Sequence, residues 1–291
     1  MTVGVKLGSD PSAKRAGSDP DLAVQGITTA RLLTLLSETT GDFGEVDVTL
    51  AEHSGIIHAD LSVGANVASA VALESNENLS NRGVQLFGAG FIVTAEEAAL
   101  LLPPPLGEGR GRGNPVQQII RDYRNGRDLT DTPRGVKVID AFGFTAEQLR
   151  TRYPAVYHWL LQRVKPEREQ NNRASYRDNW WIHGEPRKVM RKQLATLPRY
   201  IATVETAKHR TFQFLDSRIL PDNKLIAIAL SDAFSLGVLS SSAHTAWALS
   251  VGSWLGVGND PVYVKSRCFE TFPFPGEDTG LTEDLRKQIA S

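Results

Sequence analysis

Short alternations of hydrophobic and polar residues predict strands in the N-terminal part of the chain. Met1–Leu7 and the apolar run Leu32–Leu36 predict two strands around a polar loop rich in Gly, Ser, Pro and Asp. Val46–Ala51 and Ile56–Asp60 predict another strand pair, with His53–Gly55 as the turn. We therefore expect this part of the chain to be built from paired strands.

The middle and C-terminal parts alternate strand patterns with helical ones. Two capping-box sequences, Thr94–Glu97 and Thr145–Gln148, predict helix starts. The first helix should end by Pro103, and the second should continue to about Arg168. Asp232 should cap a helix that runs to about Val251, in which the spacing of His244 suits a satisfied core histidine. Leu281–Ala290 predicts a final amphipathic helix.

Strands are predicted between these helices, without the regular βαβ alternation of a parallel sheet. The strand segments are Val84–Val93, Val136–Ile139, Trp180–Ile182, Tyr200–Val204, Thr211–Leu215 and Leu225–Leu230, and Val262–Phe274 is predicted to be extended. The sequence therefore predicts an α+β fold, with mixed sheets of short strands and several helices.

Charge is distributed unevenly along a chain whose net charge is only −1. Residues 110–210 contain 21 Lys and Arg against 10 Asp and Glu, an excess of +11, whereas the rest has 11 against 23, or −12. This asymmetry favours a polyanion-binding face in the middle of the chain, although solvated surface charge is the alternative. The single cysteine, Cys268, excludes an internal disulfide. With no signal-peptide pattern and no membrane-spanning run, we expect a cytoplasmic protein without a membrane partner.

Motifs for independent catalysis are missing from the sequence. There is no Gly-rich turn for S-adenosylmethionine (SAM), and no (Asn/Asp/Ser)-Pro-Pro-(Tyr/Phe) turn that would grip a flipped base. Phosphate-binding loops, His-Glu-x-x-His and nucleophile elbows are also absent, and the six histidines lack metal-ligand spacing. We therefore expect no catalytic residues, no metal and no bound cofactor on this chain.

Three arginines, a tyrosine and an Asn-Gly turn are concentrated between Ile120 and Asp128. Guanidinium groups suit phosphate oxygens and the guanine edge, and Asn suits adenine. The alternative is a surface loop whose arginines pair with Asp122 and Asp128. The residues predicted here to bind DNA are Arg121, Arg124, Asn125 and Arg127.

The densest polar segment runs from Val164 to Trp181 and ends in paired tryptophans. Arginines beside amides suit both phosphate anchoring and readout of base edges. A strand at Trp180–Trp181 would send the two indoles to opposite faces, and burial of both in the core is the alternative to stacking. The predicted DNA-binding residues of this segment are Arg168, Asn171, Arg173 and Arg177.

Two further groups extend the prediction. The basic pairs Arg187–Lys188 and Arg191–Lys192, together with Lys208–Arg210, are ordinary solvated faces individually but would line one cleft if brought together. The loop after the Asp232 helix carries base-reading groups, or is a plain turn before the next strand. Predicted contacts from these groups are Arg187, Lys188, Lys208, Arg210, Asn259, Asp260 and Lys265.

Eleven short elements between residues 84 and 275 together resemble one protein family in order and spacing. They are Gly90–Thr94, Tyr123–Asp128, Val138–Asp140, Tyr153–Pro154, Val164–Arg168, Tyr176–Trp181, Pro198–Tyr200, Lys208–Arg210, Leu236–Ser241, His244–Trp247 and Phe269–Pro275. In these elements the chain resembles the target-recognition region of MmeI-like type IIG/IIL single-chain adenine DNA methyltransferases.

This resemblance implies double-stranded DNA as the partner and a SAM-binding methyltransferase domain upstream in the same polypeptide, which methylates adenine N6. It divides the chain into residues 1–83, the last strands of a methyltransferase fold with a connecting segment, and residues 84–275, the target-recognition domain. Residues 276–291 would begin a C-terminal helical extension.

One alternative comes from a different class of function. The basic face could belong to a non-catalytic interaction module that binds RNA or an acidic protein partner. Salt dependence separates DNA from a protein partner, because contacts to DNA phosphates weaken steeply with salt whereas a protein partner's apolar interface would resist it.

Overall fold

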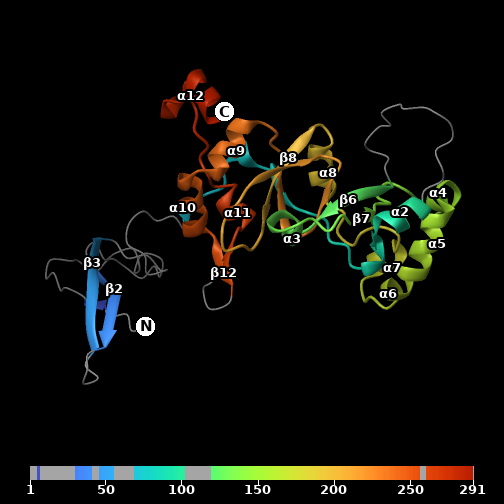
Figure 1. Cartoon of the computed structure of the whole chain (residues 1–291), viewed down its shortest axis with the longest axis horizontal. Coiled ribbons are helices and arrows are strands. Elements are labelled where there is room, and N and C mark those ends of the chain that lie inside the picture. The colour runs from blue at the N-terminus through green and yellow to red at the C-terminus, as the bar shows by residue number, and fades with distance from the viewer. Residues whose placement is uncertain are drawn as a thin grey trace, which may run out of the picture. The chain divides into compact units, whose positions relative to one another are not determined.

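The computed structural model describes residues 5–6, 30–40, 46–55, 69–101, 119–255 and 260–290. The chain divides into two compact units, residues 1–70 and 71–291. The described part of the first unit is an antiparallel sheet, and the second unit contains the remaining sheets together with every described helix (Figure 1).

The sheet of the first unit has the order β1-β2-β3 and consists of β1 (Val5–Lys6), β2 (Ala30–Thr40) and β3 (Val46–Gly55). β1 pairs antiparallel with β2, which confirms the predicted pairing of the first two strands. The predicted turn at His53–Gly55 is wrong, because these residues continue β3 and pair with Ala30–Leu32 of β2. Continued pairing satisfies backbone groups that a turn would leave open. The strand predicted at Ile56–Asp60 lies outside the described residues.

A mixed four-stranded sheet in the second unit has the order β10-β6-β7-β5. β10 (Leu220–Pro221) runs parallel to β6 (Ile120–Arg124), and the other pairings are antiparallel. β7 (Lys137–Ile139) confirms the strand predicted at Val136–Ile139. Of the strand predicted at residues 84–93, only β5 (Ile92–Val93) forms, because η3 (Ala89–Phe91) interrupts the backbone before it.

The second four-stranded sheet is antiparallel, in the order β4-β11-β8-β9. It contains β4 (Ser80–Arg82), β11 (Leu225–Ile228), β8 (Arg199–Val204) and β9 (Gln213–Asp216). The central strands β8 and β11 are almost wholly buried, as their apolar sequences predict. β12 (Ser253–Leu255) and β13 (Asp260–Val262) form a separate two-stranded sheet, which an isolated bridge between Thr206 and Val262 connects to the chain after β8.

Most helices gather at two ends of the second unit (Figure 1). Beside β6 and β7 lie α2 (Ala95–Leu101), α4 (Ala146–Arg152), α5 (Pro154–Arg163), α6 (Lys165–Glu169) and α7 (Ala174–Asp178). Near the second sheet lie α8 (Lys188–Leu194), α9 (Ala233–Ser240), α10 (Ser242–Val251) and α11 (Lys265–Cys268). The amphipathic α12 (Glu283–Ala290) packs on α9, and η2 (Glu74–Asn76) and η5 (Glu277–Thr279) are short 3-10 turns.

Both predicted capping boxes form. Thr94 and Glu97 exchange hydrogen bonds of 2.9 and 3.2 Å before α2, and Thr145 and Gln148 exchange bonds of 3.0 and 3.1 Å before α4. The continuous helix predicted from residue 145 to 168 is wrong, because the chain breaks at Tyr153 and again at Val164. A residue before proline disfavours the helical backbone, and Tyr153 precedes Pro154 directly.

The helix predicted from Asp232 to Val251 also divides in two. Asp232 caps α9 as expected, accepting a 2.8 Å bond from the Ser235 amide. Ser241 ends α9 with an extended backbone and caps α10 through its hydroxyl, which accepts from the His244 amide at 3.2 Å. His244 is fully buried, with Nε2 2.9 Å from the Tyr263 hydroxyl, as expected for a core histidine.

Two segments that were predicted to be extended are instead folded into turns. Trp180–Ile182 is a turn after α7, in which Trp180 is buried and the indole of Trp181 donates to the Phe144 carbonyl at 2.8 Å. The predicted extended stretch Val262–Phe274 contains α11 after the short β13. The architecture nevertheless remains α+β, as predicted.

Candidate nucleic-acid interface

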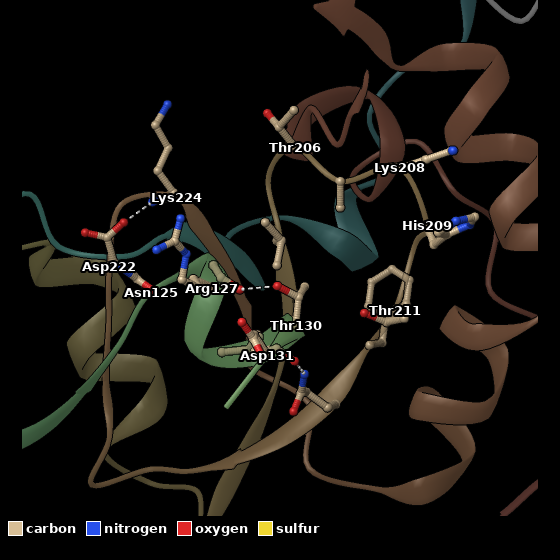
Figure 2. Close-up of a pocket in the computed structure, with 16 residues that line it drawn as sticks. Asn125, Arg127, Thr130, Asp131, Thr206, Lys208, His209, Thr211, Asp222 and Lys224 are labelled. Atoms are coloured by element: carbon tan, nitrogen blue, oxygen red, sulfur yellow. Dashed lines mark hydrogen bonds between the residues drawn. The ribbon is translucent and has the colours of Figure 1, made fainter. Parts of the chain in front are cut away.

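An open cleft of about 1160 Å³ lies between three segments of the second unit. One wall is the start of α3 (Gly126–Thr130), and the opposite wall is the chain from Val204 to Gln213. Asp222 and Lys224, in the turn between β10 and β11, complete the lining. In Figure 2, Asn125, Arg127, Asp222 and Lys224 lie to one side, and Thr206, Lys208 and His209 lie to the other.

The Asn-Gly sequence at the cleft is a helix cap rather than the loop that was predicted. The Asn125 side chain accepts from the Asp128 amide at 3.1 Å, and the Asp128 carboxylate accepts from the Asn125 amide at 2.9 Å. A Cβ on Gly126 would lie 3.0 Å from Val204 Cγ1, so glycine lets α3 approach β8 closely. Asn125 therefore lines the cleft while its Oδ1 is engaged as the cap.

Asp128 holds the α3 wall of the cleft in place. Its buried carboxylate accepts from Arg134 at Nε, 2.9 Å, and at Nη2, 2.8 Å, and from the Arg134 amide at 2.9 Å. Burial alone would raise the pKa of Asp128, but the hydrogen bonds from Arg134 and from the Asn125 amide outweigh it and lower the pKa. Asp128 therefore pairs with Arg134 rather than with Arg127, contrary to the paired-loop alternative.

Arg210 anchors the opposite wall and is partly buried there. Its guanidinium donates to the Thr203 hydroxyl at 3.1 Å and to the Pro261 carbonyl at 3.3 Å, and lies 5.1 Å over the Tyr263 ring. Burial lowers its pKa. The Ala207 amide donates to the same Pro261 carbonyl at 3.3 Å, so the wall is tied to the β12–β13 hairpin.

The exposed cations of the cleft are Arg127, Lys208 and Lys224. Among the described residues, neither Arg127 nor Lys208 has a side-chain partner, and the exposed His209 has none either. Lys224 makes a 3.2 Å ion pair with Glu205 while its side chain remains 66% exposed, a geometry that contributes little stability. The cleft therefore offers positive charge and hydrogen-bond donors to solvent, beside the exposed carboxylate of Asp131.

His209 and Lys224 were missed by the sequence analysis. His209 lies within the basic segment Lys208–Arg210 that was singled out, but it was not named as a contact of its own. The signal for Lys224 is the sequence Pro221-Asp-Asn-Lys224 between two apolar runs, which is a turn pattern at strand ends. In the structure Asp222 accepts from the Lys224 amide at 2.9 Å in that turn.

The arginines of the segment predicted to be richest in DNA contacts are engaged within the protein. Arg168 is 1% exposed and donates to the carbonyls of Leu86, 2.7 Å, and Ile182, 3.0 Å. Arg173 donates to the Tyr176 hydroxyl at 3.0 Å, and Arg177 donates to the Asn171 carbonyl at 2.7 Å. Arg168 therefore has no surface on which to meet a phosphate, and the other two keep only part of their donors.

The remaining predicted residues are dispersed. Arg121 and Lys188 line a separate pocket, and Arg187 pairs with Glu185 at 2.6 Å. Arg124 donates to the Tyr123 carbonyl at 3.2 Å. Lys265 pairs with Glu270, and Asp260 is exposed at the start of β13. Asn259 lies outside the described residues.

No group of three or more His, Cys, Asp or Glu side chains within the described ranges could hold a metal ion. None of the helices described here is long and apolar enough to cross a membrane.

Residues 145–276 match the family model of the MmeI target recognition domain. No curated protein matches the chain. Among solved structures, the type IIL restriction-modification enzyme MmeI in complex with DNA is similar, with a TM-score of 0.61 and 16% sequence identity. The similarity covers 88% of this chain and 32% of MmeI, so the chain spans about a third of that enzyme's length.

These comparisons confirm the resemblance to the MmeI-like target-recognition region, and the shared fold is the α+β architecture described above. The matched range contains the Val204–Gln213 wall and the Asp222–Lys224 turn of the cleft, whereas the α3 wall precedes it.

Proposed function

We propose that this chain recognises specific double-stranded DNA sequences for a restriction-modification enzyme, and that the cleft is the surface that meets the DNA. The family match over residues 145–276 supports the class of function. The observation that carries the assignment to the cleft is the set of unpaired or weakly paired donors at Arg127, Lys208, His209 and Lys224. Such donors are what phosphate oxygens and base edges require.

We assign a role to each cleft residue according to how exposed its side chain is and how firmly its backbone is held. Lys208 and Lys224, on flexible exposed side chains, would hold phosphates. Arg127 stands at the first turn of a helix whose cap is fixed by Asp128, so its guanidinium would be presented from a rigid backbone. That placement suits the two-point contact that arginine makes to a guanine edge. Asn125 would add a single donor.

We further propose that recognition by this region serves SAM-dependent methylation of adenine N6 in the cytoplasm. The methyl transfer would belong to a methyltransferase domain upstream in the same polypeptide. The support is the family resemblance, together with the lack of a SAM-binding turn in this sequence.

The test is the salt dependence of duplex binding, measured by fluorescence anisotropy. The triple variant Arg127→Ala, Lys208→Ala, Lys224→Ala should bind more weakly, and the log–log salt slope should fall by about 0.9 for each phosphate contact that is lost. A matched control removes three exposed cations elsewhere, Arg150 and Arg152 on α4 and Lys287 on α12. If both triple variants behave alike, the cleft is not the DNA surface. Binding that resists salt in the unmodified chain would favour a protein partner instead.

A further inference from the structure

A second pocket of the same unit lies apart from the cleft and has a different character. Its volume is about 390 Å³, in the range of small-molecule sites. Its floor and sides are apolar and are formed by Phe142, Phe144, Met190, Leu194, Ile219 and Leu220. An open apolar cavity of this size is costly to leave in contact with water unless something fills it.

One wall of the pocket is charged through a buried carboxylate held between two arginines. Asp140 accepts two bonds from Arg191, 2.6 and 2.9 Å, and a longer 3.4 Å contact from Arg121. Burial would raise the pKa of Asp140, but the charges of Arg191, His183 and Arg121 lower it to about 2. With one negative and two positive charges, this wall keeps a net positive charge at neutral pH.

The two guanidinium groups also retain unused donors. Arg121 donates to the carbonyls of Arg218, 3.0 Å, and Ser217, 2.9 Å, besides Asp140. Arg191 donates to Asp140 and to the Pro186 carbonyl at 2.5 Å. Each guanidinium has five N–H groups, so each keeps two that no described residue accepts. Partial exposure, 17% for Arg121 and 12% for Arg191, leaves these groups accessible from the pocket.

Two lysines add to the positive charge at the mouth of the pocket. Lys188 and Lys192 are exposed, line the cavity and have no carboxylate partner among the described residues. With Arg121 and Arg191 they make four cations against the single Asp140. The pocket therefore combines an apolar floor with a net charge of +3.

We propose that this pocket is a separate binding site for a small amphipathic anion, with a flat apolar body and one carboxylate or phosphate group. The body lies on Phe144, Leu194 and Leu220, and the acidic group meets Arg121 and Arg191 beneath the two lysines. An uncharged molecule of the same shape would gain only the apolar contacts, so the charge sets the selectivity.

Calorimetry on the full chain tests the proposal with 2-naphthoate, 2-naphthyl phosphate and the uncharged 2-naphthamide as probes. At least one anion should bind saturably with one site per chain, and the amide should bind at least about tenfold more weakly. Comparing the two anions separates a carboxylate from a phosphate as the natural group. No saturable binding of either anion, or equal binding of the amide, overturns the proposal.

Variants test whether the probes bind in this pocket. Lys188→Ala with Lys192→Ala should weaken the anion about three- to tenfold and leave the amide unchanged. Ala195→Trp, at an exposed position that lines the cavity, should block both by filling it. Lys208→Ala, which removes a cation from the cleft, should change neither. Circular dichroism and thermal melting confirm that each variant is folded.

Competition with DNA distinguishes this site from the cleft. If the two sites are independent, a duplex oligonucleotide should not displace the naphthyl anion, and Ala195→Trp should retain DNA binding. Displacement by DNA, together with loss of DNA binding in Ala195→Trp, would make the pocket part of the nucleic-acid surface and would overturn the separate site. Failure of the cleft proposal alone leaves these outcomes unaffected.

Discussion

The segment Lys165–Asn179 and the cleft segment Val204–Gln213 use positive charge in opposite ways. The first is the denser in arginine and amide side chains, yet Arg168 is buried and Arg173 and Arg177 donate to neighbouring protein atoms. The second has fewer basic residues, and Lys208 and His209 face solvent without partners among the described residues. Density of charge in the sequence therefore does not measure the charge that a surface offers.

The reason lies in what arginine can do. A guanidinium carries five donors in a planar fork and can satisfy several backbone carbonyls at once. Arg168 donates to two carbonyls from distant segments, at Leu86 and Ile182, and the Leu86 carbonyl also accepts from the Gly184 amide at 3.3 Å. Lysine, with one flexible ammonium, is poorly suited to that task and remains at the surface.

The largest expected effect would test whether Arg168 is structural. Arg168→Ala should lower the free energy of unfolding by about 2–4 kcal/mol, because the hydrogen bonds to the Leu86 and Ile182 carbonyls are lost and a cavity opens. Urea unfolding of the variant measures this change. Lys208→Ala is the matched loss of one positive charge at an exposed site and should change stability by less than about 0.5 kcal/mol.

In DNA binding, the same two variants should show the opposite order of effect, with the larger change in Lys208→Ala. Folded Arg168→Ala should keep the salt slope of the unmodified chain, whereas Lys208→Ala should reduce it. Normal stability together with a reduced salt slope in Arg168→Ala would show that Arg168 contacts DNA rather than stabilising the fold.

Two buried histidines lie close to these regions, His183 near Arg168 and His244 near Arg210, so a change of pH affects the stability of the fold. Burial lowers the pKa of His183, which packs near Arg168, to about 4, and burial with the nearby Arg210 lowers that of His244 to about 4. The unfolded chain binds protons at these sites below about pH 6.5, and the folded chain does not until about pH 4. Stability should therefore fall as the pH drops through this window.

The loss should be about 1–3 kcal/mol for each histidine, at about 1.4 kcal/mol per pKa unit. Urea unfolding at a series of pH values between 7 and 4 measures it. The variant His183→Gln should flatten the profile, whereas His158→Gln, at an exposed position on α5, should not. Identical profiles for the two variants would show that His183 does not cause this pH dependence of stability.

A smaller effect is expected for the two partly exposed arginines of the first region. Arg173→Ala with Arg177→Ala should lower stability by about 0.5–1.5 kcal/mol, because bonds to Tyr176 and Asn171 are lost. Anisotropy titrations should show a salt slope close to that of the unmodified chain. A slope reduced by about 1.8, the value for two phosphate contacts, would place this region on the DNA.

The smallest effect on folding is expected at the hairpin that adjoins the cleft. Asp260 is exposed, so Asp260→Asn should change stability by less than about 0.5 kcal/mol. Within a complete methyltransferase, the change should relax methylation at one position of the target if Asp260 reads a base. Lys265 is held by Glu270, so Lys265→Ala should act at most uniformly on all sequences. Sequencing of methylated sites distinguishes the two results.

Local signals in the sequence predicted much of the fold. The capping residues Thr94, Thr145 and Asp232 act within four residues of themselves, and the buried strands β8 and β11 follow from continuous apolar runs. The breaks at Tyr153 and Ser241 were missed for different reasons. Pro154 marks the first, whereas Ser241 is compatible with either helix until tertiary packing chooses.

The site was harder to predict, because whether a side chain is free to contact a ligand depends on the tertiary structure. Asn125, Arg127 and Lys208 were singled out from composition, and the structure brings them to one cleft. Nothing local shows that the carbonyl of Ile182 takes a side-chain donor in place of a strand partner. Nor does the sequence show that Lys224, far from Arg127 along the chain, completes the same lining.

The anchoring of the two cleft walls bears on how such proteins diverge. Asp128 and Arg210 hold the walls from within, through backbone groups and buried partners. The exposed positions, Arg127, Lys208, His209 and Lys224, contribute little to that anchoring. If the cleft contacts DNA as proposed, substitutions there alter recognition while folding is preserved, and successive single mutations can explore new targets without passing through unstable intermediates. Selection then acts on recognition separately from the scaffold that supports it.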